Sequence, residues 1–135
     1  MWKNRLYNFG LLWLRTLAGA GMAYHGYGKI FGGGMSGFIQ GVAGLGFPLP
    51  EFFAWAAALS EFAGGLLLII GFMTRPAAFF VFVTMAVAAF VRHAADPFSV
   101  KELALCYWTM AGTLIFTGGG AWSLDEFFCK KLLKV

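Results

Sequence analysis

Three ionisable side chains stand in an otherwise apolar stretch near the start of the chain. They are Arg15, His25 and Lys29, and most residues between them are small or apolar. At about 100° per residue of α-helix, the three side chains share one helix face. Such groups are costly at membrane depth and usually face a bundle interior or a wet cavity. A neutral histidine in that position can accept a proton, for example from a quinol.

A fourth ionisable group, Glu61, lies in a second apolar stretch that begins at Glu51. Glu61 is about ten residues from the start of that stretch, and Arg15 is about nine residues into the first one from the opposite side. We therefore predict an Arg15–Glu61 pair, because pairing is how a membrane interior tolerates both charges. Two interpretations stay open. The pair is either a structural lock between helices, or the polar floor of a cavity for a quinone head group or an anion, with a carboxylate able to carry protons.

A second polar group is predicted near the outer mouth of the helices, formed by His25, Lys29, His93, Asp96 and Glu102. The structural alternative is that the basic side chains reach for lipid headgroups and the histidines hydrogen-bond the backbone. His25 and His93 are the candidates for a haem or copper ligand pair, but two ligands without a spacing motif do not define a metal site. We therefore predict no metal, and we favour quinone over haem as the cofactor.

Long apolar blocks must position these groups. Hydrophobic residues make up 60% of the 135 residues and charged residues 12%, which is about half the charged fraction of a soluble domain. The basic residues flank the apolar blocks, as in membrane proteins, and do not form the dense basic run that nucleic-acid binding requires. We therefore predict one all-α integral membrane domain over residues 1–135, in contact with the lipid bilayer.

Four of the blocks are long enough to cross a hydrocarbon core of ~30 Å. We predict spans at about 6–30, 51–73, 76–92 and 100–117, forming a four-helix bundle, and a short amphipathic interfacial helix at about 124–134. The glycine-rich segment 32–50 is predicted to hold a short helix over the bundle mouth.

The distribution of basic residues predicts the orientation of the bundle. Four spans place both termini on one side of the membrane. That side collects Lys3, Arg5, Arg75, Lys130, Lys131 and Lys134, against Lys29, Arg92 and Lys101 on the other. The excess of positive charge predicts that both termini are cytoplasmic.

Five short motifs follow one another along the chain: Tyr24-His25-Gly26-x-x-Lys29-Ile30-Phe31, Gly46-Phe47-Pro48-Leu49-Pro50, Glu61-x-x-Gly64-Gly65-x-x-Leu68, Gly71-x-x-Thr74-Arg75 and Trp122-Ser123-Leu124-Asp125. Together they resemble the DoxX family of small bacterial membrane proteins, over nearly the whole chain. The resemblance implies a four-helix inner-membrane protein associated with oxidoreductase systems. It also implies that the characteristic polar positions are Arg15, His25, Lys29, Glu61 and Arg75.

The resemblance also bears on partners. Related DoxD-type proteins look like the membrane subunit of thiosulfate:quinone oxidoreductase, and some DoxX members are linked to thiol and oxidative-stress complexes with soluble partners. In this chain Cys106 and Cys129 lie far apart with no Cys-x-x-Cys pair, so dithiol chemistry within the chain is not predicted.

The predicted function is that of a membrane subunit of a bacterial redox system, which contacts quinone and partners a soluble thiol or sulfur oxidoreductase. If the chain takes part in catalysis, it does so as an oxidoreductase subunit of the thiosulfate- or thiol:quinone type, and we identify no catalytic residue. The alternative is a non-catalytic membrane adaptor or assembly subunit of a larger complex. A homo-oligomer is open under either interpretation.

Overall fold

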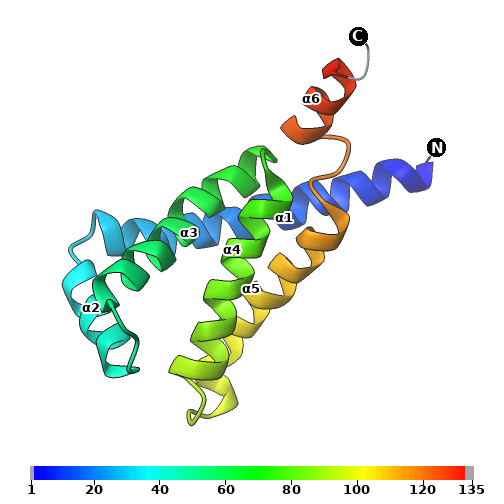
Figure 1. The fold of residues 1–135 in the computed structure, drawn as a ribbon. Coiled ribbons are helices and arrows are strands. Elements are labelled where there is room, and N and C mark those ends of the chain that lie inside the picture. The colour runs from blue at the N-terminus through cyan, green and yellow to red at the C-terminus, as the bar shows by residue number, and fades with distance from the viewer. Residues whose placement is uncertain (1, 133–135) are drawn as a thin grey trace.

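The computed structural model describes residues 2–132, which form helices and no strands (Figure 1). In chain order the elements are α1 (Trp2–Ile30), α2 (Met35–Gly44), α3 (Pro50–Ile70), α4 (Thr74–Val87), the π-helix η1 (Ala88–Arg92), α5 (Phe98–Thr117) and α6 (Leu124–Leu132). The four segments predicted as spans are helical, except that α3 ends at Ile70 and residues 71–73, predicted within the second span, form a turn. The short helix predicted within 32–50 is α2. The predicted interfacial helix corresponds to α6, and its predicted last residues, 133 and 134, lie outside the described residues.

The helices form two antiparallel pairs that meet at one end (Figure 1). α1 lies along α3, and α5 lies along α4 and its continuation η1. We call the end with the α3–α4 turn, the C-terminal end of α5 and the start of α6 the joined end. The opposite end, with α2, η1 and the loop 93–97, is the open end. Both ends of the described chain lie at the side of the joined end.

The turn at the joined end is fixed by local backbone chemistry and by one distant side chain. Gly71 ends α3 in the left-handed conformation, with φ of 71°, and its N–H donates to the carbonyls of Leu67 and Leu68. The carboxylate of Asp125 then accepts hydrogen bonds from the backbone N–H groups of Met73 (2.7 Å) and Thr74 (2.8 Å). A carboxylate at a helix N-terminus satisfies free N–H groups and complements the helix dipole, so Asp125 caps α4.

α1 and α3 approach so closely that glycine is required between them. A Cβ atom built on Gly65 would lie 2.5 Å from the backbone nitrogen of Ala23 and 2.6 Å from the carbonyl oxygen of Gly19. Small residues at such crossings let two helix backbones meet. The buried apolar core lies beside this contact, between α1, α3, α4 and α5, and comprises Met22, Leu68, Ala77, Ala78, Val81, Met85, Ala111 and Leu114.

Hydropathy alone identifies two helices in the described chain that are long and apolar enough to cross a membrane. They are Pro50–Ile70, which is α3, and Thr74–Arg92, which is α4 with η1. α1 and α5 are long enough as well, with 29 and 20 residues, but their polar residues lower the average. Membrane crossing by α1 and α5 therefore stays a prediction.

Replacing Gly65 by alanine is expected to lower the stability of the fold, because the added Cβ meets backbone atoms that cannot move aside. Overpacking of this kind costs on the order of 1–3 kcal/mol, which a thermal melt of the purified protein in detergent will detect. Gly28→Ala on α1 is the matched control, since its Cβ meets nothing within 4 Å and alanine favours the helix. Equal melting temperatures for Gly65→Ala and the unchanged chain would contradict this packing.

Candidate functional site

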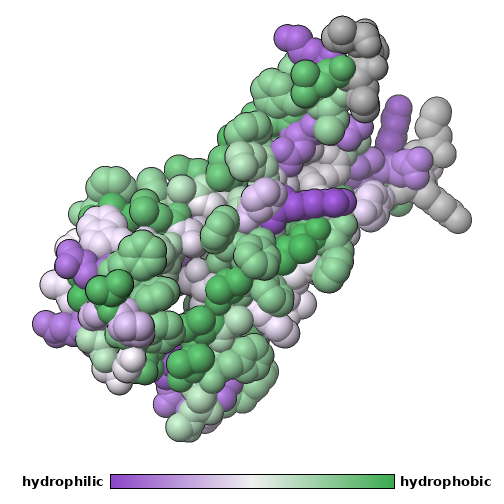
Figure 2. All heavy atoms as spheres, viewed as in Figure 1, coloured by the Kyte–Doolittle hydropathy of each residue, from purple (hydrophilic) through white to green (hydrophobic). Residues whose placement is uncertain are grey.

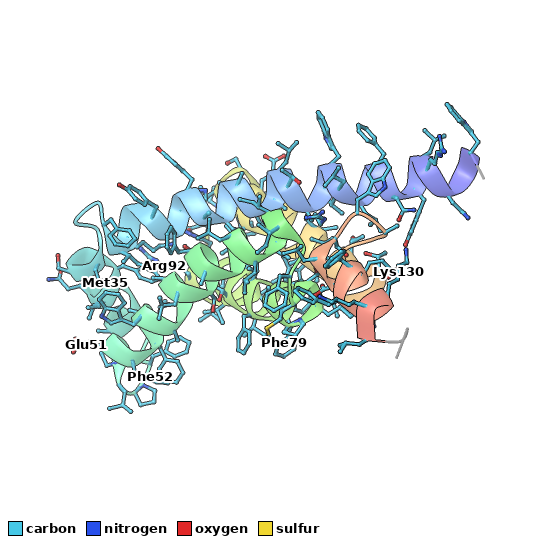
Figure 3. All side chains as sticks on the ribbon, turned by 90° about the horizontal axis from the view of Figure 1, so that it is seen from above. Met35, Glu51, Phe52, Phe79, Arg92 and Lys130 are labelled. Atoms are coloured by element: carbon cyan, nitrogen blue, oxygen red, sulfur yellow. The ribbon has the colours of Figure 1, made fainter. Side chains whose placement is uncertain are left out.

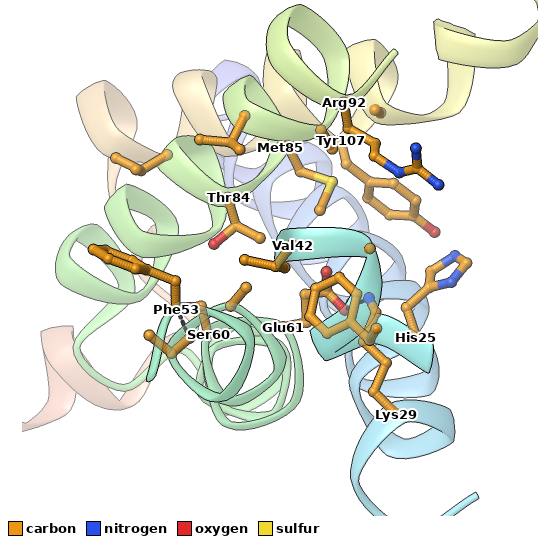
Figure 4. A pocket seen from close by; sticks show the side chains of 18 of the residues that line it. His25, Lys29, Val42, Phe53, Ser60, Glu61, Thr84, Met85, Arg92 and Tyr107 are labelled. Atoms are coloured by element: carbon orange, nitrogen blue, oxygen red, sulfur yellow. Dashed lines mark hydrogen bonds and ion pairs between the residues drawn. The ribbon is translucent and has the colours of Figure 1, made fainter. Parts of the chain in front are cut away.

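A cavity of about 660 Å³ lies between the two helix pairs, towards the open end (Figure 4). Its volume is within the range of 300–1,000 Å³ that is typical of small-molecule sites. Every element from α1 to α5 contributes residues to the cavity wall, and those from α2 include Phe38 and Val42. Most of the wall is apolar, which suits a ligand with a hydrocarbon part.

An ion pair lies in this wall. The Nζ atom of Lys29, at the end of α1, donates to a carboxylate oxygen of Glu61 in the middle of α3. The side chain of Glu61 is only 4% exposed and that of Lys29 is 24% exposed. Lys29 also lies over the ring of Phe38 on α2, with Nζ 4.7 Å from the ring centre, a cation–π contact. The buried carboxylate is thus neutralised by a cation that keeps some access to the cavity mouth.

The predicted Arg15–Glu61 pair is wrong. α1 begins at Trp2 and its 29 residues span about 43 Å, more than a hydrocarbon core. Arg15 lies beside the C-terminal end of α3, where it contacts the carbonyls of Leu68 and Ile69. The predicted depth of Arg15 was counted from the start of the first apolar block, and this count placed Arg15 too close to Glu61. The cation that reaches Glu61 is Lys29.

Arg15 binds backbone carbonyls at the joined end, away from the cavity. Its Nε donates to Gly119 (3.2 Å), Nη1 donates to Leu68 (3.1 Å) and Ile69, and Nη2 donates to Trp122 (2.6 Å). The side chain is 2% exposed. The last carbonyls of a helix have no partner within it, and the guanidinium fork carries enough donors for several of them. Arg15 therefore ties α1 to the end of α3 and to the α5–α6 connection.

His25 joins Lys29 and Glu61 at the cavity, as the shared helix face predicted for His25 and Lys29 indicates. Its ring meets that of Tyr107 on α5 edge to face, with centroids 6.0 Å apart. In Figure 4 the imidazole lies at the edge of the cavity, on the same side as the Tyr107 hydroxyl. Of the predicted polar pocket, three residues come together here and Arg15 does not.

The predicted outer-mouth group is only partly brought together. His93 lines the cavity, and its Nδ1 lies 2.7 Å from a carboxylate oxygen of Asp96. Asp96 and Glu102 are exposed and do not line the cavity. Both candidate metal ligands, His25 and His93, lie in the cavity wall, but within residues 2–132 no three His, Cys, Asp or Glu side chains gather as metal ligands do.

Sequence reasoning missed four polar members of the wall: Ser60, Thr84, Arg92 and Tyr107. Arg92 ends an apolar block, a position from which basic side chains commonly reach for lipid headgroups. Tyr107 gave only a slight signal, a hydroxyl within the fourth block. The π-helix that carries Arg92 has no sequence signature, although such turns are frequent at functional sites.

Comparison with known proteins finds one family model and several relatives. The model of the DoxX family matches residues 10–94. A protein of Escherichia coli named "Inner membrane protein YqjF" is 33% identical over 133 residues, which cover 95% of this chain and 98% of that protein. A protein of Haemophilus influenzae is 40% identical over 82 residues, 56% of this chain and 61% of that protein, so the chain spans less than two thirds of that relative.

A further relative carries a functional name. The Bacillus subtilis protein named "Putative oxidoreductase CatD" is 38% identical over 72 residues, which cover 53% of this chain and 51% of that protein. No solved structure matches the chain.

The role of Arg15 predicts a large loss of stability for Arg15→Lys, because a single ammonium group cannot reach four carbonyls on two segments at once. The expected loss is on the order of 3 kcal/mol, measured by thermal melting in detergent. Arg75→Lys is the matched control, since Arg75 is exposed and donates one bond of 3.3 Å, to Phe116, so its change should stay within about 0.5 kcal/mol. Equal losses for the two variants would overturn the assignment.

Proposed function

The chain belongs to the DoxX family, and on this basis we propose that it is a single-domain, four-span protein of the bacterial inner membrane. α1, α3, α4 with η1, and α5 are the four spans, and both termini face the cytoplasm.

The surface supports this arrangement. Hydrophobic side chains cover most of the face seen in Figure 2, and hydrophilic ones gather towards its ends. The polar residues that lower the hydropathy of α1 are also satisfied inside the protein: Arg15 by carbonyls and Lys29 by Glu61. Internal partners reduce the cost of ionisable groups at membrane depth, so these residues do not oppose insertion of α1.

The C-terminal helix supports the proposed orientation. On α6 the exposed side chains of Leu124, Phe127 and Leu132 accompany Lys130 and Lys131. Apolar and basic residues on one short helix are typical of a helix that lies in the membrane interface. Figure 3 places Lys130 at the end of the molecule that carries the N-terminal half of α1, and Glu51 at the far end, so this basic helix belongs to the side of the joined end, where we place the cytoplasm.

We further propose that the cavity binds a quinone, and that the chain is the membrane subunit of a redox system with a soluble thiol or sulfur oxidoreductase as partner. The observation that supports this most directly is the Lys29–Glu61 pair, with His25 beside it, in the wall of an otherwise apolar cavity. An apolar pocket with a few converging polar groups is the usual form of a small-molecule site.

The polar groups have separate tasks in this proposal. A bound quinone accepts two electrons, supplied by the partner as it oxidises thiols or thiosulfate, and two protons. Lys29 donates a hydrogen bond to a quinone oxygen while it remains close to Glu61. His25 relays protons from water at the cavity mouth to the quinone oxygens as the quinone is reduced, because an imidazole can both bind and release a proton.

The second candidate function is a non-catalytic adaptor that anchors or assembles a larger complex. Its support is that Lys29 and Glu61 satisfy each other, as a purely structural pair does. In that case substitutions at the pair alter assembly of the complex and leave quinone binding unchanged, so one binding experiment separates the two candidate functions.

Binding of a short-chain benzoquinone to the purified protein in lipid nanodiscs, measured by equilibrium dialysis, is expected to weaken at least tenfold in Glu61→Gln and in His25→Ala. Glu102→Gln is the matched control, since it removes the same charge from an exposed position outside the cavity. His25→Ala leaves the Lys29–Glu61 ion pair in place, so a loss of quinone affinity in this variant cannot be attributed to a broken ion pair. Unchanged affinity in both cavity variants, or no binding by the unchanged chain, refutes the quinone site.

A further inference from the structure

One cation in the cavity wall has no counter-ion. The ionised side chains of the wall are Lys29, Glu61 and Arg92, and Lys29 is neutralised by Glu61. Across the described part of the chain the ion pairs are Lys29–Glu61, Lys130–Glu126 and, when His93 is protonated, His93–Asp96, and none includes Arg92. With the histidines neutral, the wall therefore keeps one unneutralised positive charge.

The π-helix accounts for the position of this cation. The N–H of His93 donates to the carbonyl of Ala88 at 3.0 Å, a bond five residues back along the chain. Adjacent residues of a regular α-helix point about 100° apart, yet Arg92 and His93 both line the cavity. Figure 4 draws the guanidinium of Arg92 at the same edge of the cavity as the Tyr107 hydroxyl.

We propose that Arg92 holds the carboxylate of a single-chain acidic amphiphile, of the long-chain fatty acid class, whose tail lies in the apolar part of the cavity. The guanidinium fork matches both oxygens of a carboxylate, and the Tyr107 hydroxyl can donate a further bond. This ligand class goes beyond the quinone proposal and does not depend on it.

The charge of the wall selects a carboxylate rather than a phosphate. A phosphate monoester carries about −1.5 to −2 near neutral pH, whereas the wall offers a single unneutralised cation. Arg92 is exposed, so its guanidinium can meet a ligand head group at the edge of the cavity. One cation balances one monoanion there, and a second negative charge on the ligand would have no cationic partner in the wall.

The rest of the wall suits a hydrocarbon tail. Phe53 on α3 and Phe79, Phe80 and Val83 on α4 all line the cavity. In the proposed four-span arrangement Arg92 lies at the outer interface, so the acidic head stays near water while the tail enters the apolar region. Burial of each CH₂ group contributes about 0.8 kcal/mol.

The test compares radiolabelled palmitate with its methyl ester on the full chain in zwitterionic nanodiscs, by equilibrium dialysis with empty nanodiscs subtracted. The unchanged chain is expected to bind palmitate at least tenfold more tightly than the ester. Arg92→Gln should remove that preference and leave ester binding as it was, and Arg92→Lys should keep part of it. Arg75→Gln, which removes a cation from the other end of the same helix, should behave like the unchanged chain.

Three results would overturn the proposal: equal binding of acid and ester by the unchanged chain, unchanged palmitate binding in Arg92→Gln, or an equal loss in Arg75→Gln. Tighter binding of a single-chain phosphate monoester than of palmitate would overturn the carboxylate assignment. The same samples are tested with the benzoquinone. Palmitate binding without quinone binding would refute the quinone site alone, and quinone binding without a palmitate preference would refute this inference alone.

Discussion

The guanidinium of Arg15 is the group on which the arrangement of the helices depends. A buried cation in apolar surroundings requires several partners, and helix ends supply carbonyls that no intrahelical N–H can satisfy. Arg15 meets both needs together, because it bonds the last turn of α3 and the connection from α5 to α6. Asp125, just beyond that connection, caps the start of α4. The two helix pairs are therefore fastened at the joined end, and the space between them is left towards the open end.

This arrangement separates the ionisable groups by task. Arg15 and Asp125 bind backbone groups and hold the fold. Lys29 and Glu61 neutralise each other. Two charged groups can therefore lie in the cavity wall, where a ligand can contact them. The close contact of Gly19 with Gly65 sets the register of α1 on α3. That register brings Lys29 within reach of Glu61, and it places Arg15 about 21 Å from Lys29 along α1.

The local signals in the sequence predicted the helices and the shared face of His25 and Lys29, since both depend on periodicity within one segment. These signals failed where a contact depends on how far along the bundle a residue lies, or on backbone groups that are distant in the sequence. The partners of Arg15 at Gly119 and Trp122 lie 104 and 107 residues away, and a carbonyl has no signature in a side-chain pattern. Arg92 and Tyr107 were missed for a related reason: a π-turn and the packing of α4 on α5 place them in the wall, and neither is encoded by residue spacing.

The fold and the site together imply that the space between the helix pairs is a ligand cavity. Photolabelling tests it most directly, with a quinone that carries a diazirine near its ring, the protein in nanodiscs, and mass spectrometry to locate the adducts. If the quinone binds there, adducts form at cavity residues such as Ser60, Thr84 and Tyr107 and disappear with excess unlabelled quinone. Adducts spread over outward residues such as Trp13 and Phe116, unaffected by the competitor, would contradict it.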